Sequence, residues 1–108
     1  MGETAFRVIF SADADADIEG LSDYWAARGE AWRGEKYHRD LLHRAETELS
    51  DAASARRGRR AKIKEWPDAR EILAFGVYRI IYRIDEAAGV VNVLRFWHAH
   101  RNEPGADA

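Results

Sequence analysis

The sequence predicts a two-layer α+β domain in which an N-terminal strand and an α-helical hairpin precede an antiparallel sheet of three or four strands. In the first half of the chain, apolar residues recur at intervals of three and four, the period of an amphipathic helix. The second half changes to short runs rich in β-branched and aromatic residues, separated by glycine or proline, as strands are. Helices on one side of an antiparallel-rich sheet form a two-layer domain.

The opening segment, Phe6–Phe10, is short, apolar and β-branched, and it predicts a strand. Ser11 or Asp13 can then cap a helix, because a short polar side chain accepts hydrogen bonds from the free N–H groups of a first turn. Gly29 provides a natural end to this helix. Its apolar stripe consists of Ala14, Ile18, Leu21 and Trp25.

A second helix is expected from about Glu30 to Ala53. Two amphipathic helices joined near one glycine predict an antiparallel hairpin whose stripes face the core. The stripe of the second helix consists of Tyr37, Leu41, Ala45 and Leu49.

The remainder of the chain begins with a basic turn at Arg56–Arg60 and continues with strand-like runs. Gly89 closes the hairpin loop between the last two of them. The helices can cover only one face of the sheet, so the other must be polar, be covered by the C-terminal tail, or receive a partner. The four expected strands are Ala61–Trp66, Arg70–Phe75, Tyr78–Asp85 and Val90–Trp97.

The composition bounds the class of protein. A chain of 108 residues, 46% of them hydrophobic, can bury one core, so we expect a single domain over residues 1–108 with an ordered core at about 5–101. The absence of cysteine excludes disulfides, thiolate metal sites and cysteine nucleophiles. No segment has the apolar character of a signal peptide or a membrane span, and we therefore expect a cytoplasmic protein.

Charge is divided unevenly along the chain. Residues 1–55 contain 6 Lys and Arg against 12 Asp and Glu, whereas residues 56–101 contain 11 against 5. This division indicates a positive surface for an anionic partner, either nucleic acid or an acidic protein segment. The alternative is that the two halves neutralise each other.

Several motifs follow one another in the order found in a known family. The helical half contributes Asp17-Ile18 and Tyr24-Trp25. The C-terminal third contributes Arg70-x-Ile72-Leu73, then Gly76-x-Tyr78-Arg79-Ile80-Ile81-Tyr82-Arg83-Ile84-Asp85, and then Val90-Val91-x-Val93-Leu94-Arg95-Phe96-Trp97-His98 followed by Arg101. Over residues 6–101 the chain resembles the toxins of the RelE/ParE superfamily, the toxin half of bacterial type II toxin–antitoxin pairs.

The resemblance implies a β-α-α-β-β-β fold and a toxin that a cognate antitoxin holds inactive. RelE-like members cleave messenger RNA on the ribosome, whereas ParE-like members inhibit DNA gyrase. The long helical hairpin is similar to the ParE branch, so we expect a ParE-like gyrase inhibitor in a hetero-oligomer with a ParD-like antitoxin. The alternatives are a RelE-like, ribosome-dependent mRNA endoribonuclease and a non-toxic member that only binds its antitoxin.

Cleavage of RNA through its 2′-hydroxyl needs a base, cations at the phosphate and an acid for the leaving oxygen. Histidine suits the acid or base role because its pKa lies near neutrality. Glu65 is a possible carboxylate base, but the set has no clearly paired base, which favours binding over catalysis. The candidate residues are Arg79, Arg83, Arg95, His98, His100 and Arg101.

The alternation of a strand offers another interpretation of the same residues. Tyr78 and Tyr82 share a face with apolar neighbours and are expected in the core. Arg79 and Arg83 lie on the opposite face, where they could instead pair with carboxylates of the helices or of an antitoxin.

Two surfaces are candidates for partners. The expected antitoxin-binding residues are Trp25, Trp32, Tyr37, Arg79 and Arg83, since Trp, Tyr and Arg are favoured anchors at interfaces. A basic patch suits phosphates or an acidic antitoxin segment, and it consists of Arg56, Arg57, Arg59, Arg60, Lys62 and Lys64. We expect no metal ion and no other cofactor, because His98 and His100 lack a third ligand other than Glu103.

Overall fold

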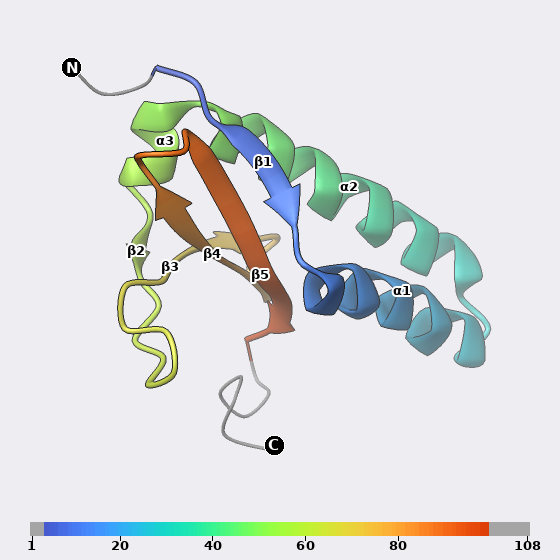
Figure 1. Cartoon of the computed structure of the whole chain (residues 1–108). Helices are drawn as coiled ribbons and strands as arrows, with labels where there is room; N and C mark the ends of the chain where they lie inside the picture. The colour runs from blue at the N-terminus through green and yellow to red at the C-terminus, as the bar shows by residue number, and fades with distance from the viewer. Residues whose placement is uncertain (1–3, 100–108) are drawn as a thin grey trace.

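Five strands form one mixed sheet in the order β1-β5-β4-β3-β2, and the helices cover one of its faces (Figure 1). The computed structural model describes residues 4–99. The two-layer α+β architecture predicted from the sequence is confirmed. In chain order the elements are β1 (Arg7–Phe10), α1 (Ala12–Ala27), α2 (Ala31–Ser50), α3 (Ala52–Arg56), β2 (Arg59–Arg60), β3 (Arg70–Ala74), β4 (Tyr78–Asp85) and β5 (Val90–His98).

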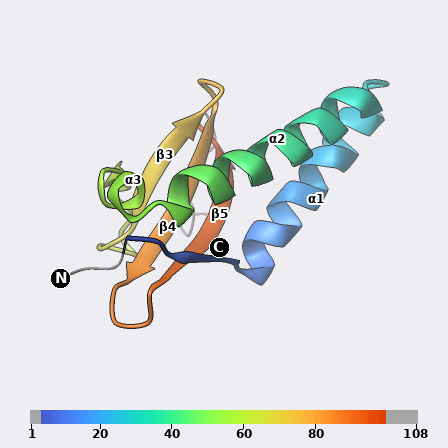
Figure 2. The same ribbon diagram turned by 90° about the horizontal axis from the view of Figure 1, so that it is seen from above.

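The helical hairpin forms as predicted. Ser11 is the N-cap of α1, and its hydroxyl accepts a hydrogen bond from the N–H of Ala14 at 3.0 Å. Gly29, at φ 76°, has the left-handed backbone that favours glycine and turns the chain into α2. The tip of the hairpin projects beyond the sheet (Figures 1 and 2), which accounts for the 50 Å length of the molecule. Within the described part of the chain, no helix has the length and apolar character needed to cross a membrane.

The segment between the hairpin and β3 differs from its prediction. The second helix ends at Ser50 rather than at Ala53, because the carboxylate of Asp51 accepts the N–H of Ser54 at 3.1 Å and begins the short helix α3. The predicted basic turn contains β2, which pairs antiparallel with β3. The predicted strand Ala61–Trp66 is wrong, because Lys62 adopts a left-handed φ of 59° that no continuous strand can include.

Both faces of the sheet are covered. Side chains of α1 and α2 pack with Tyr78, Ile80 and Tyr82 in the main core, as the alternation of β4 predicts. The opposite face, called here the back face, carries a second cluster made of Ala61, Ile63, Ala69, Ile81 and Trp97. The loop at residues 61–69 therefore covers the face that the sequence left unassigned.

Tyr82 joins the sheet to α3. Its side chain is fully buried, and its hydroxyl donates to the carbonyl of Ala55 at 2.6 Å. Burial raises the pKa of Tyr82 to about 12, because the phenolate would lose its hydration. Gly58 lies directly against this hydroxyl, and a Cβ at that position would sit 1.8 Å from it.

We predict that Gly58→Ala lowers the free energy of unfolding by about 2 kcal/mol, since overpacking a rigid core typically costs 1–3 kcal/mol. Chemical denaturation followed by tryptophan fluorescence measures the change. Gly20→Ala is the matched control, because a Cβ at Gly20 meets nothing within 4 Å. It should stabilise α1 by about 0.5–1 kcal/mol. Equal stability of the two variants would contradict the close packing of Gly58 against Tyr82.

Candidate binding cleft

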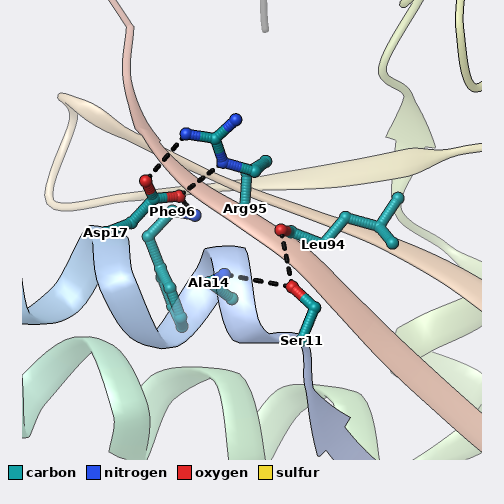
Figure 3. Close-up of polar contacts among 6 residues, drawn as sticks. All are labelled: Ser11, Ala14, Asp17, Leu94, Arg95 and Phe96. Atoms are coloured by element: carbon teal, nitrogen blue, oxygen red, sulfur yellow. Dashed lines mark hydrogen bonds and ion pairs between the residues drawn. The ribbon is translucent and has the colours of Figure 1, made fainter. Parts of the chain in front are cut away.

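The edge of β5 is open over its second half. β1 pairs with β5 only as far as Val93, so the last five residues of β5 extend past the end of β1. A register shift in β4–β5 pairing leaves Leu94 without a partner in β4. Its carbonyl instead accepts the Ser11 hydroxyl at 2.9 Å (Figure 3). The start of α1 thus covers the edge of β5 just beyond the end of β1.

Asp17 makes the second link between α1 and β5. Its carboxylate accepts two hydrogen bonds from the Arg95 guanidinium, at 2.7 and 2.8 Å, and the backbone N–H of Phe96 at 3.0 Å (Figure 3). The two side chains are only 11% and 21% exposed, so water screens the ion pair weakly. A bidentate pair of this kind defines direction as well as distance. Asp17 therefore sets the angle at which α1 leaves the sheet.

A cleft of about 570 Å³ opens beyond this link, between α1, the start of β4 and the end of β5. Its volume falls in the range of ligand-binding pockets. The walls are mostly apolar, and Asp17 and His98 provide polar groups at the sides. The lining residues are Ala16, Asp17, Gly20, Leu21, Tyr24, Trp25, Leu41, Tyr78, Phe96 and His98.

Stacked aromatic rings support one wall of the cleft. Trp25 stacks on Tyr37 with 6.0 Å between ring centroids, and Tyr37 meets Tyr78 at 5.4 Å. Gly34 permits the close approach of α2 to α1 beside these rings, since a Cβ there would lie 3.1 Å from the Cβ of Trp25. The Trp25 indole N–H is buried without a hydrogen bond in residues 4–99. Burial raises the pKa of the nearby Tyr78 hydroxyl.

The predicted antitoxin-binding residues separate into groups. Trp25 lines the cleft, and Tyr37 lies behind it as a support. Trp32 lies near the tip of the hairpin, is 60% exposed and does not line the cleft. Tyr24, which was not predicted as an antitoxin-binding residue, is 48% exposed at the cleft and meets Trp25 edge-on at 5.2 Å.

Arg79 and Arg83 lie on the back face, away from the cleft. Arg79 donates to the buried carboxylate of Glu71 at 2.7 Å and to the carbonyl of Ala61 at 3.0 Å. Arg83 pairs with Asp68 at 3.0 Å. The carboxylates that these arginines meet thus belong to β3 and the loop before it, and not to the helices. Both arginines help to hold the loop against the sheet.

His98 lies on the other side of the sheet from these arginines. Its ring meets Tyr78 edge-on at 5.5 Å and lines the cleft, on the helix-covered face. Along β4, Arg79 and Arg83 are four residues apart, or roughly 13 Å at the rise of a strand. The candidate nuclease residues within the described part are therefore divided between two faces, with Glu65 exposed in the loop. His100 and Arg101 lie outside the described residues.

The predicted basic patch contains both paired and unpaired cations. Arg56 pairs with Glu86 at 2.8 Å, and Arg59 pairs with Glu71 at 2.6 Å. Arg57, Arg60, Lys62 and Lys64 form no ion pair with a described residue. Among residues 4–99, no group of three His, Asp or Glu side chains is placed to hold a metal ion.

Comparison with known proteins identifies the family of the chain. The model of the ParE toxin of the type II toxin–antitoxin system parDE matches residues 8–103. The chain therefore belongs to the ParE toxin family, within the RelE/ParE superfamily that the sequence motifs resemble. No curated protein sequence matches it significantly.

Solved structures show the same fold. A chain of the chromosomal ParDE toxin–antitoxin system from P. aeruginosa aligns with a TM-score of 0.75 and 16% identity, over 91% of this chain and 100% of that one. A chain of the RelBE2 toxin–antitoxin complex from Mycobacterium tuberculosis aligns with a TM-score of 0.67 and 22% identity, over 91% and 97% of the two chains. At these sequence identities, the two alignments show a shared fold.

We predict that Asp17→Asn lowers the free energy of unfolding by roughly 2–3 kcal/mol, because it removes the carboxylate charge that the partly buried Arg95 guanidinium binds on α1. Urea denaturation of the purified chain measures the loss. Asp23→Asn removes the same charge from an exposed position on the same helix and should change stability by less than about 0.5 kcal/mol. A similar small effect at Asp17 would rule out the ion pair as the link that holds α1 to β5.

Proposed function

We propose that this ParE-family toxin acts by binding, that its cellular target is DNA gyrase, and that a ParD-like antitoxin neutralises it. The observation that supports binding over catalysis is the separation of His98 from Arg79 and Arg83 on opposite faces of the sheet. Acid–base cleavage of RNA requires these groups within hydrogen-bond reach of one phosphate. The membership of the ParE family supports gyrase as the target.

The cleft between α1 and β5 is the proposed antitoxin-binding surface. Its apolar walls suit the apolar face of an amphipathic segment that folds on binding, the helix-in-groove mode of recognition. The solved ParDE and RelBE2 relatives are toxin–antitoxin systems, which supports a partner of this kind. Trp25 and Tyr24 are the proposed anchors in this cleft, whereas Arg79 and Arg83 are already engaged in ion pairs within the toxin.

Purified toxin added to DNA gyrase and relaxed plasmid should abolish supercoiling and accumulate cleaved DNA, and cells that express it should become filamentous. The toxin mixed beforehand with its cognate antitoxin is the control, and it should leave supercoiling intact. Normal supercoiling in the presence of the free toxin would reject gyrase as the target.

The same cells distinguish the other two functions. Primer extension on translated messenger RNA should detect no new cleavage sites, and cleaved transcripts would instead establish a ribosome-dependent endoribonuclease. Unaffected growth without the antitoxin would identify a non-toxic member that only binds its antitoxin. Either cleaved transcripts or unaffected growth would count against the proposed gyrase inhibition.

A further inference from the structure

Three exposed cations lie in β2 and in the loop that follows it. We call this surface the basic edge, and it consists of Arg60, Lys62 and Lys64. None of the three pairs with a carboxylate among residues 4–99, although most other arginines of the described chain do. Glu65 is exposed in the same loop and reduces the charge of the surface without cancelling it.

The loop that presents these cations is anchored to the sheet. Ala61 and Ile63 are buried in the back-face cluster, so Lys62 between them points to solvent. The guanidinium of Arg79 holds the Ala61 carbonyl at 3.0 Å, and the pair between Arg83 and Asp68 fixes the far end of the loop. Cations on an anchored loop lose less conformational freedom when they bind a ligand than cations on a mobile one.

The opposite end of the molecule is acidic. The sixteen residues of α1 contain five carboxylates and no Lys or Arg. Apart from Asp17, these carboxylates are exposed, and they are Asp13, Asp15, Glu19 and Asp23. α1 and β2 lie on opposite sides of the molecule (Figure 1), so an anionic partner is attracted to one end and repelled from the other.

We propose that the basic edge binds the sugar–phosphate backbone of a nucleic-acid duplex. Guanidinium and ammonium groups are the usual partners of phosphates, and they need no particular base sequence. Single-stranded ligands are less suitable, because the nearby Trp66 is partly buried against the back-face cluster and the basic edge contains no other aromatic ring for stacking. An acidic protein segment is also less suitable, because the basic edge contains no exposed apolar anchor.

The salt dependence of duplex binding tests this proposal. The full chain is titrated into fluorescently labelled 20-base-pair duplexes of DNA and of RNA, and fluorescence anisotropy measures the dissociation constant. Neutralising three phosphates should give a slope of about −2.7 in log affinity against log salt, a loss of roughly 40-fold between 50 and 200 mM NaCl. The two duplexes distinguish DNA from RNA as the source of the phosphates, and binding to either supports the proposal.

A triple variant isolates the basic edge. Arg60→Gln, Lys62→Asn and Lys64→Gln together should weaken binding at least tenfold at 50 mM NaCl and bring the slope close to zero. Asn at position 62 tolerates the left-handed backbone, so the substitution removes the charge without adding strain. Circular dichroism and thermal unfolding check that the variant keeps its fold. Lys64→Gln alone is a milder variant that should reduce the magnitude of the slope by about 0.9.

A second triple variant with the same loss of charge tests whether the change in duplex affinity comes from this surface or from the net charge of the protein. Arg28→Gln, Lys36→Gln and Arg39→Gln together remove three exposed cations from the helical hairpin and should leave duplex affinity within about twofold. Equal weakening by the two triple variants would overturn the proposal. Absence of duplex binding, combined with basic-edge-dependent binding of a labelled polyglutamate peptide, would also overturn it and assign the surface to an acidic protein segment.

Discussion

The fold depends on how α1 closes the open edge of β5. A strand edge with unpaired N–H and C=O groups must be covered, because unpaired backbone groups are costly when buried and promote aggregation when exposed. β1 covers the first half of this edge, and Ser11 and Asp17 cover part of the second. The helix then leaves the strand, and the cleft lies in the space between them. The polar contacts of Ser11 and Asp17 thus hold α1 against the edge of the sheet and position the candidate binding site.

The arginines of the sheet illustrate how structural and functional roles are divided. Glu71 is the buried carboxylate that holds Arg59 and Arg79, and Arg95 is held by Asp17. A charge that is paired and partly buried maintains the geometry of the loop and the helix, and breaking the pair costs more than the pair contributes. The unpaired cations of the basic edge have no such role in the fold. They are therefore the ones whose charge remains available to a partner.

The sequence predicted the elements whose burial follows a simple period. The hairpin has apolar stripes and β4 has an alternation that match their burial, whereas β5 was predicted as an apolar run and is buried on both faces. Residues 61–66 also alternate, with Ala61 and Ile63 buried and Lys62 and Lys64 exposed. That alternation is produced by packing on top of the back face rather than by membership of the sheet, and local sequence cannot distinguish the two.

The candidate site was only partly predictable for a similar reason. Trp25 was identified because it is a large aromatic residue on a helix, whereas Asp17 gave no local signal that it would reach Arg95 across 78 positions of sequence. The division of His98 from the arginines depended on strand register, which alternation predicts only when the pairing is regular. Here a register shift between Ile81 and Tyr82 interrupts it.

The affinity of the cognate antitoxin for two toxin variants tests most directly whether the cleft is the binding surface. Isothermal titration calorimetry compares Tyr24→Ala, which truncates a wall of the cleft, with Trp32→Ala, which truncates a more exposed ring near the hairpin tip. Tyr24→Ala should weaken binding by about tenfold or more, the effect of losing an interface anchor, and Trp32→Ala by less than about twofold. The reverse order, or unchanged affinity in both variants, would contradict the assignment of the cleft.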